Sequence, residues 1–412
     1  MRFFIQRIMA GRRKKNDDPL YGELLAAAEH INEELVALRR DLHMHPELGW
    51  NENETSEKII KKLTDAGLRS RNGLAGYGLY TDIGKNSGSM VAYRADMDAL
   101  PIQDQKQVPY ASKVPGCAHM CGHDVHTTIA LGVARVLYQF SDELQGRVRV
   151  IWQPAEETQP SGAPEMISAG VLDGVKAIYG AHCDPTLETG RFSIRRGAET
   201  AAFDSFIITV KSDSTTHSAR PHMGTDTIWI ANQIIQNLYQ FIGRITDVLK
   251  PTTISVCTFH AGEALNVIPN TVEFGGTIRT VSDDKREGIR TYVKSLIGSM
   301  QSLYDVQIDI RFGMGAPPVQ NDVRLHDHAL HLIQQQLGKN AFREREQSMG
   351  AEDFSFYTRI VPSLFIRIGS AGSPQTSYPL HSSLFDVDER LITPTVAFMS
   401  WLLIRNLSDK PC

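Results

Sequence analysis

The sequence predicts an α/β protein in which a smaller α+β domain is inserted into a larger α/β domain. A length of 412 residues favours two domains over one or three. Short apolar runs alternate with helical patterns in the first half of the chain, which is typical of α/β domains. That pattern changes after about residue 201 and returns after 315, so we expect the C-terminal segment to complete the larger domain.

The larger domain is expected to open with helices. Apolar residues at helical spacing predict a first helix within 18–41, ended by His45-Pro46, and a second over about 55–66, capped by Gly67. Strands and helices should then alternate around a largely parallel sheet. The strands are predicted at 89–95, 147–152 and 176–181, and the helices at 124–139 and 164–169.

The middle of the chain reads as a separate α+β insert. Period-two patterns predict strands, and amphipathic patterns predict helices. The strands are expected at 203–210, 252–260 and 271–279, and the helices at 225–242 and 283–303. After Gly315-Ala-Pro-Pro, we predict a helix over 322–337, a strand over 363–368 and a last helix from about 393 to 406.

The composition favours a globular protein that binds a small molecule. Hydrophobic residues make up 42% of the chain, charged residues 22%, and the formal net charge is −4. The chain therefore lacks the basic surface expected of a nucleic-acid-binding protein. No window approaches about 18 consecutive apolar residues, so we expect no membrane span.

Cysteine usage and the N-terminal segment bear on location. Five cysteines without regular spacing favour a reducing compartment, and hence the cytoplasm. A basic run at 12–15 follows a short apolar stretch, which reverses the order of a secretory signal. We expect residues 1–18 to form a disordered arm.

The first chemically distinctive segment spans residues 117–126. It contains two Cys, three His and one Asp just before a predicted helix. A closed structural zinc site would require paired Cys and His ligands at the spacings of zinc fingers, and these spacings are absent.

Other candidate groups follow predicted strands, where ligands gather in open α/β sheets. Gln153-Pro-Ala-Glu-Glu157 places two adjacent carboxylates after one strand. Neighbouring side chains of an extended segment point in opposite directions, so Glu156 and Glu157 could take different roles. The alternative is a solvated acidic pair that begins the next helix. His182 ends another strand, and His381 lies in a Pro-rich loop.

Seven stretches, in chain order, resemble the motifs of one enzyme family. They are His43-Met-His-Pro-Glu-Leu, Arg94-Ala-Asp-Met-Asp-Ala-Leu-Pro, Cys121-Gly-His-Asp-Val-His, Gln153-Pro-Ala-Glu-Glu, Asn266-Val-Ile-Pro, Met349-Gly-Ala-Glu-Asp-Phe and His381-Ser. Together they look like the M20 metallopeptidase family. The most similar subgroup contains hippurate hydrolases, N-acyl-amino-acid amidohydrolases and plant auxin-conjugate hydrolases.

This resemblance implies a metal-binding α/β catalytic domain over 19–201 and 315–412, with an inserted α+β lid over 202–314 that often dimerises. A homodimer or higher homo-oligomer through the lid is therefore expected. The resemblance also implies Glu156 as the catalytic carboxylate and Asp96 as the residue that orients a metal ligand. The implied metal ligands are Cys121, His123, Glu157, His182 and His381.

In the lid, the stretch from Thr216 to Asp226 resembles the family segment whose first histidine reaches the substrate. This makes His217 the candidate oxyanion donor, although the usual upstream glycines are replaced by Lys211-Ser-Asp-Ser-Thr215. The resemblance also implies that Asn266 and Arg279 bind substrate oxygens, and an Arg guanidinium suits a free carboxylate.

The chemistry of amide hydrolysis is consistent with this set. Two divalent ions about 3.5–4 Å apart can activate water and stabilise an oxyanion. Glu156 would move the proton from metal-bound water to the departing amine, and Cys121 as thiolate could bridge the metals. A covalent Cys121 with His123 as base would leave the other four groups without a role. Zinc or manganese is expected, with cobalt or nickel possible.

The predicted function is hydrolysis of N-acyl amino acids to a carboxylic acid and a free amino acid. The main alternative is a dinuclear-metal aminopeptidase or dipeptidase that acts on short peptides. A non-catalytic binding protein on the same fold is disfavoured, because all five implied ligands and the base are present.

Overall fold

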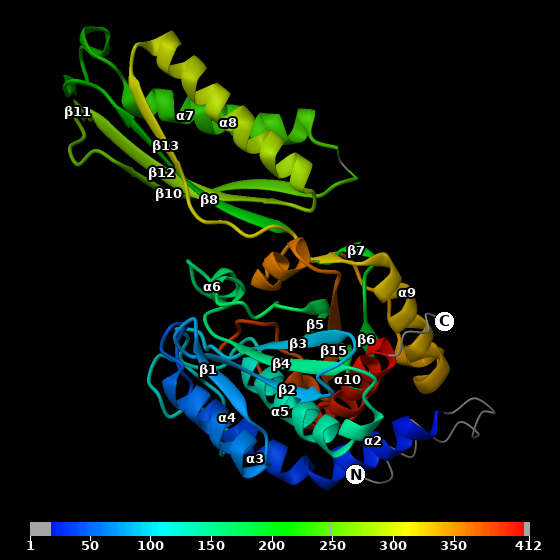
Figure 1. Cartoon of the computed structure of the whole chain (residues 1–412). Helices are drawn as coiled ribbons and strands as arrows, with labels where there is room; N and C mark the ends of the chain where they lie inside the picture. The colour runs from blue at the N-terminus through cyan, green and yellow to red at the C-terminus, as the bar shows by residue number, and fades with distance from the viewer. Residues whose placement is uncertain (1–17, 248, 408–412) are drawn as a thin grey trace. The chain divides into compact units, whose positions relative to one another are not determined.

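The computed structural model describes residues 18–247 and 249–407 (Figure 1). The predicted N-terminal arm lies outside the described residues, apart from Asp18. Contacts divide the chain into two compact units. The larger unit runs to Gly197 and includes Gln320–Glu346 and the chain from Phe356; the smaller unit is Ala198–Val319 with Gln347–Ser355. The boundaries predicted from the sequence lie after 201 and 314.

The larger unit contains a seven-stranded mixed sheet (Figure 1). In spatial order the strands are β1 (Ser70–Leu74), β2 (Gly78–Gly84), β4 (Arg147–Gln153), β3 (Met90–Asp96), β5 (Val175–Glu188), β15 (Ser363–Ala371) and β6 (Phe192–Ser193). The four central strands, β4 to β15, are parallel, and β1, β2 and β6 pair antiparallel. This confirms the predicted α/β class, with the parallel arrangement confined to the centre of the sheet.

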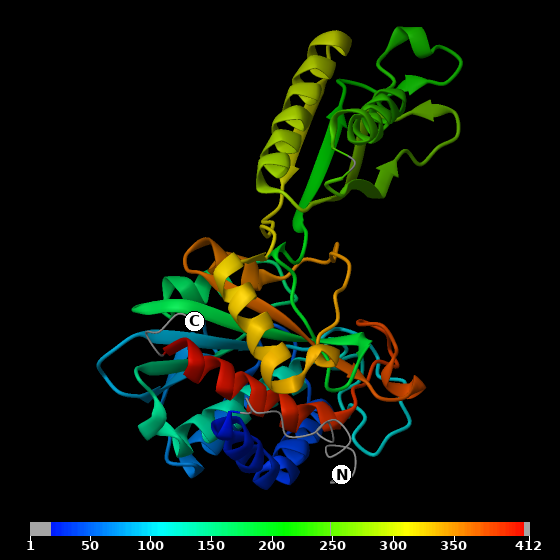
Figure 2. The ribbon, with the colours of Figure 1, turned by 90° about the vertical axis from the view of Figure 1, so that its right-hand side faces the viewer.

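Helices α5 (His123–Gln139) and α10 (Ile392–Leu407) pack against this sheet (Figures 1 and 2). Almost every side chain of α5 is buried, because the helix is covered by the sheet on one side and by α3 and α10 on the other. No described helix has the length and apolar character needed to cross a membrane.

The N-terminal helical segment is divided. The sequence predicted one helix within 18–41, whereas the structure has α2 (Pro19–His30) and α3 (Asn32–Met44), separated by a turn at Ile31. The Asp18 side chain caps α2 by accepting the N–H of Leu20. The other described α-helices of this unit are α4 (Asn53–Asp65), α6 (Gly162–Ser168) and α9 (Val323–Leu332).

The smaller unit is an antiparallel sheet with two helices on one face. Its strands, in spatial order, are β10 (Thr252–Ala261), β12 (Thr271–Thr280), β8 (Ala202–Lys211) and β13 (Gln307–Phe312). Helices α7 (Thr227–Ile245) and α8 (Asp283–Tyr304) cover the face that carries Phe206, Ile208 and Phe274. A separate two-stranded ribbon pairs β9 (Thr216–His217) with β11 (Val267–Ile268).

Candidate metal centre

Five side chains predicted as ligands converge in the larger unit. Cys121 and His123 stand at the start of α5, Glu157 follows β4, His182 lies on β5, and His381 lies in the loop after β15. Their donor atoms form two overlapping groups, each within 4.8 Å: Cys121 with His123 and His182, and Cys121 with Glu157 and His381. Both groups contain Cys121, so its sulfur lies within reach of the other donors of either group.

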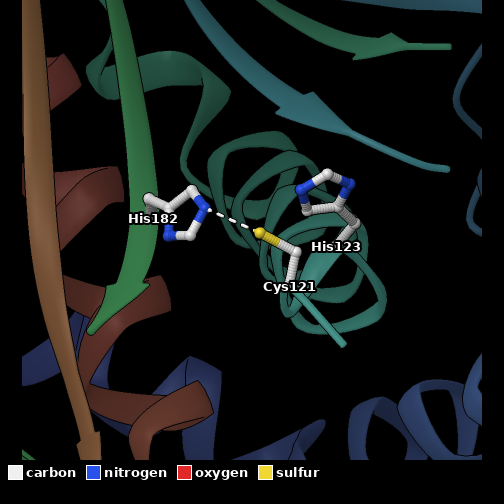
Figure 3. Close-up of side chains that lie close together, drawn as sticks. All are labelled: Cys121, His123 and His182. Carbon is white, nitrogen blue, oxygen red and sulfur yellow. Dashed lines mark hydrogen bonds between the residues drawn. The ribbon is translucent and has the colours of Figure 1, made fainter. Parts of the chain in front are cut away.

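Cys121, His123 and His182 lie close together (Figure 3). Cys121 Sγ lies 3.4 Å from His182 Nε2, and its side chain stands between the rings of His182 and His123. His381 Nε2 lies 3.2 Å from Glu157 Oε1, which is 4.0 Å from His123 Nε2. The start of α5 approaches β5 closely: a Cβ on Gly122, where φ is +90°, would lie 3.2 Å from Cys183 Sγ.

Hydrogen bonds orient two of the histidines with Nε2 toward the centre. His182 Nδ1 donates to the Cys183 carbonyl at 2.7 Å, and His123 Nδ1 contacts Asp98 Oδ1 at 3.1 Å. An imidazole whose Nδ1 proton is held in this way offers its Nε2 lone pair to a metal. His123 Nε2 is buried without a hydrogen-bond partner in the described structure. This orphaned atom, beside the Glu157 carboxylate, fits a divalent cation.

Carboxylates set the protonation of the centre. Burial lowers the pKa of His123, but the Asp96 and Asp98 carboxylates outweigh it and raise that pKa to about 10. A hydrogen bond to Glu157 raises the pKa of His381. Burial holds the pKa of His182 well below its ordinary value. The negative potential at His123 Nε2 therefore favours a cation there, whether a proton or a metal ion.

Asp98, which was not among the predicted residues, contacts His123. Asp96, which the resemblance places where a metal ligand is oriented, is bonded to Arg94 at 2.6 Å and to His126 Nδ1 at 2.7 Å, and stands 3.8 Å from His123 Nε2. His126 Nε2 in turn accepts the Cys183 N–H. Asp96 therefore supports β5 beside His182 through His126, and the orienting contact to His123 belongs to Asp98.

Glu156 and Glu157 reach the same centre. Their carboxylates and His123 form a third group within 4.8 Å. The expectation that they point in opposite directions was wrong, because it assumed an extended backbone. Ala155 has a φ of +55° and β4 ends at Gln153, so the extended backbone assumed for the pair is absent.

A buried charge network joins two segments that carry ligand-type residues. Arg39 of α3 is fully buried and bonds to Asp124 and to Asp386, each at 2.8 Å. Asp124 follows His123, and Asp386 lies five residues beyond His381. The His381 N–H also donates to the Met120 carbonyl at 2.7 Å. These contacts hold the start of α5 against the His381 loop.

Comparison with known proteins agrees with this geometry. The family described as "Peptidase family M20/M25/M40" matches residues 92–404. The chain belongs to the M20 peptidase family. An N-acetylcysteine deacetylase from Bacillus subtilis is 36% identical over 372 residues, covering 90% of this chain and 96% of the relative. An N-acyl-L-amino acid amidohydrolase from Geobacillus stearothermophilus is 37% identical over 300 residues, covering 73% and 81%.

A solved structure extends the similarity to the fold. A dinuclear metal-binding M20 peptidase from Bacillus subtilis aligns with a TM-score of 0.80 at 33% identity, covering 93% of this chain and all of that chain. As a member of the M20 family, this chain is a metal-dependent hydrolase. Its mixed sheet matches that of the family structures.

The smaller unit of this M20 chain holds the remaining predicted residues. Exposed His217 pairs with Val267 across β9 and β11, and the carbonyl of Asn266 accepts the N–H of Ser218. Arg279, on β12, donates to the Met349 carbonyl at 2.8 Å and stacks over the Phe203 ring. His217 and Asn266 thus lie together at the two-stranded ribbon of the smaller unit, and Arg279 lies on the four-stranded sheet of that unit.

Proposed function

We propose that this protein hydrolyses the amide bond of N-acyl amino acids, releasing a carboxylic acid and a free amino acid. The observation that carries the proposal is the pair of ligand groups that share Cys121, with Glu156 beside them. Two divalent ions held by Cys121, His123, Glu157, His182 and His381 would activate the attacking water and stabilise the developing oxyanion. Similarity to the deacetylase and the amidohydrolase supports the substrate class.

Glu156 acts in this proposal as the general base. It is half-buried next to Glu157 and close to His123, so it faces the place where water would be activated. It takes a proton from the attacking water and delivers it to the departing amine. Burial, together with Glu157 and Glu156, raises the pKa of the Cys121 thiol well above its ordinary value. A covalent Cys121 nucleophile would leave Glu157, His182 and His381 without a role.

Residues of the smaller unit are proposed to bind the substrate. His217 Nδ1 accepts the N–H of Ala219 at 3.1 Å, which leaves the proton of a neutral ring on Nε2, where it can be donated to an oxyanion. No described carboxylate forms an ion pair with Arg279, so its guanidinium can serve a substrate carboxylate. We propose that Asn266 contributes a further polar contact to substrate oxygens.

We also propose which metals are bound, how the chain assembles and where it is located. Sulfur and imidazole donors suit zinc, while carboxylates also accept manganese, cobalt or nickel. We propose a homodimer through the smaller unit, where β10 is an edge strand that a second copy could extend. A cytoplasmic location fits the free thiols of Cys117, Cys121, Cys183 and Cys257.

A substrate panel tests the proposed reaction against its main alternative. The metal-reconstituted enzyme should hydrolyse acetyl and benzoyl amino acids faster than unblocked dipeptides of the same residues. Amine release measured on both series, with zinc and then with manganese, gives the ratio of kcat/KM. A clear preference for dipeptides with a free amino terminus would establish the aminopeptidase or dipeptidase reading in its place.

Arg279 is expected to bind the free carboxylate of the substrate. Arg279→Ala should weaken binding of free acids by about ten- to a hundredfold, since a charge-assisted bidentate pair contributes about 1.5–3 kcal/mol. The wild type should discriminate against amidated substrates, and the variant should lose most of that discrimination. Measuring kcat/KM for acid and amide pairs checks this. If the variant keeps the wild-type ratio, Arg279 has no part in recognising the carboxylate.

A further inference from the structure

The turn that carries Glu156 and Glu157 starts from an unfavourable backbone conformation. Ala155 has a φ of +55°, which is costly for a residue with a Cβ and persists only where its surroundings hold it. Its N–H donates to Glu52 Oε1 at 2.6 Å, and its carbonyl accepts the N–H of Gly162 at 2.8 Å. Both the N–H and the carbonyl of Ala155 therefore have hydrogen-bond partners.

The segment that supplies Glu52 packs directly on this turn. Glu52 precedes α4, and its side chain is completely buried. At Gly49, a Cβ would lie 3.2 Å from the Ala155 Cα and 2.6 Å from Thr158 Cγ2, so a larger residue there would push the two segments apart. The close approach brings the Glu52 carboxylate within reach of the Ala155 N–H.

A carboxylate at this position is unfavourable by itself. No cation of the described residues forms an ion pair with Glu52, and its Oε2 is buried without a hydrogen-bond partner there. Burial and the nearby Asp98 raise the pKa of Glu52 to about 7. An apolar side chain would fill this space at lower cost. The hydrogen bond to the Ala155 N–H explains why an acceptor stands here.

We propose that Glu52 is a positioning residue that fixes the backbone at Ala155 and so aims the Glu156 carboxylate. Asp98 holds the residue that follows Glu156, because its Oδ2 accepts the Glu157 N–H at 2.9 Å. The residues before and after Glu156 are thus each held by a buried carboxylate. This inference rests on the proposed role of Glu156 as base and adds the residue that orients it.

Two substitutions separate hydrogen bonding from charge. Glu52→Gln keeps the side-chain length and an acceptor oxygen but removes the charge. Glu52→Asp keeps the charge but is one methylene shorter and withdraws from Ala155. In metal-loaded enzyme, Glu52→Asp should lower kcat by about tenfold to a hundredfold, as loss of a supporting contact to an active centre commonly does. KM and metal content should stay near wild type, and Glu52→Gln should recover most of the activity.

Controls make the role of Glu52 distinguishable from a general structural one. Glu54→Asp applies the same shortening to an exposed side chain two residues away and should leave kcat unchanged. If Glu52 acts through Glu156, adding Glu52→Asp to Glu156→Gln should lower kcat little further. A purely structural role would lower Tm while kcat per metal-loaded molecule stayed the same, which would overturn the proposal.

Hydrogen exchange at the Ala155 amide gives a readout that needs no substrate. Exchange should be faster in Glu52→Asp than in Glu52→Gln, whose rate should approach wild type. If the wild type cleaves no N-acyl amino acid, the proposed function fails, and exchange still decides whether Glu52 holds the turn. The positioning role is overturned if Glu52→Gln is as impaired as Glu52→Asp. It is also overturned if Glu52→Asp keeps the wild-type kcat or the wild-type exchange rate at Ala155, or if Glu52→Asp loses activity in proportion to the metal that it loses. If Glu52→Asp does not fold, a lowered kcat in folded, metal-loaded Glu52→Gln would still overturn the positioning role.

Discussion

Replacing Glu156 by Gln is expected to lower kcat by about 10² to 10⁴, the usual contribution of a general base. The amide keeps the shape of the side chain but cannot take a proton from water. The five ligand-type residues are untouched, so metal content should stay near the wild-type value. Steady-state kinetics and elemental analysis of the same preparation measure both quantities.

Glu157→Gln is the matched comparison, because it makes the same change in the adjacent residue. Glu157 Oε1 contacts His381 and lies near His123, so this variant should lose metal as well as activity. If both variants keep their metal and only Glu157→Gln is inactive, the two roles are reversed. A fully active Glu156→Gln enzyme would show that Glu156 is not the general base.

Removing the metal is expected to abolish hydrolysis, and returning a divalent ion should restore it. Cys121→Ala should have a comparable effect, since its sulfur belongs to both ligand groups. This variant should release metal at chelator concentrations that the wild type withstands. A covalent cysteine nucleophile would instead give a Cys121→Ala enzyme that is loaded with metal and inactive.

Part of the centre could be predicted because several of its residues stand at the ends of regular elements, whereas His182, predicted to end a strand, lies within β5. His123 begins a helix, and Glu157 follows a strand whose apolar run is evident in the sequence. The carboxyl ends of parallel strands meet at one edge of a sheet, so residues distant in the chain were expected to converge there. The structure brings together all five side chains predicted as ligands.

The parts that could not be predicted depend on backbone detail. Asp96 and Asp98 are two positions apart in one motif, and only the fold shows that Asp98 reaches the Nδ1 of His123. The left-handed conformation of Ala155 has no signal in the sequence, since most positions with positive φ carry Gly. For that reason the relation between Glu156 and Glu157 was mispredicted.

Long-range contacts were a second source of missed residues. Arg39 and Glu52 lie in the N-terminal helical region. Asp124 and Asp386, which bind Arg39, are 85 and 347 positions away from it, and Ala155 is 103 positions away from Glu52. Helical periodicity describes the face of a helix that is buried, but not which charged groups it meets. Strand β1 was not predicted, because its residues are mostly exposed and lack the apolar run that predicted the central strands.

Titration of metal-free enzyme with zinc or manganese tests the two-metal account most directly. Hydrolysis of an N-acyl amino acid should be absent at the start, rise as metal is added, and reach its maximum at two ions per chain. Cys121→Ala, titrated in parallel, should need far more metal to reach any activity. Full activity in protein shown by elemental analysis to contain no metal would contradict the account.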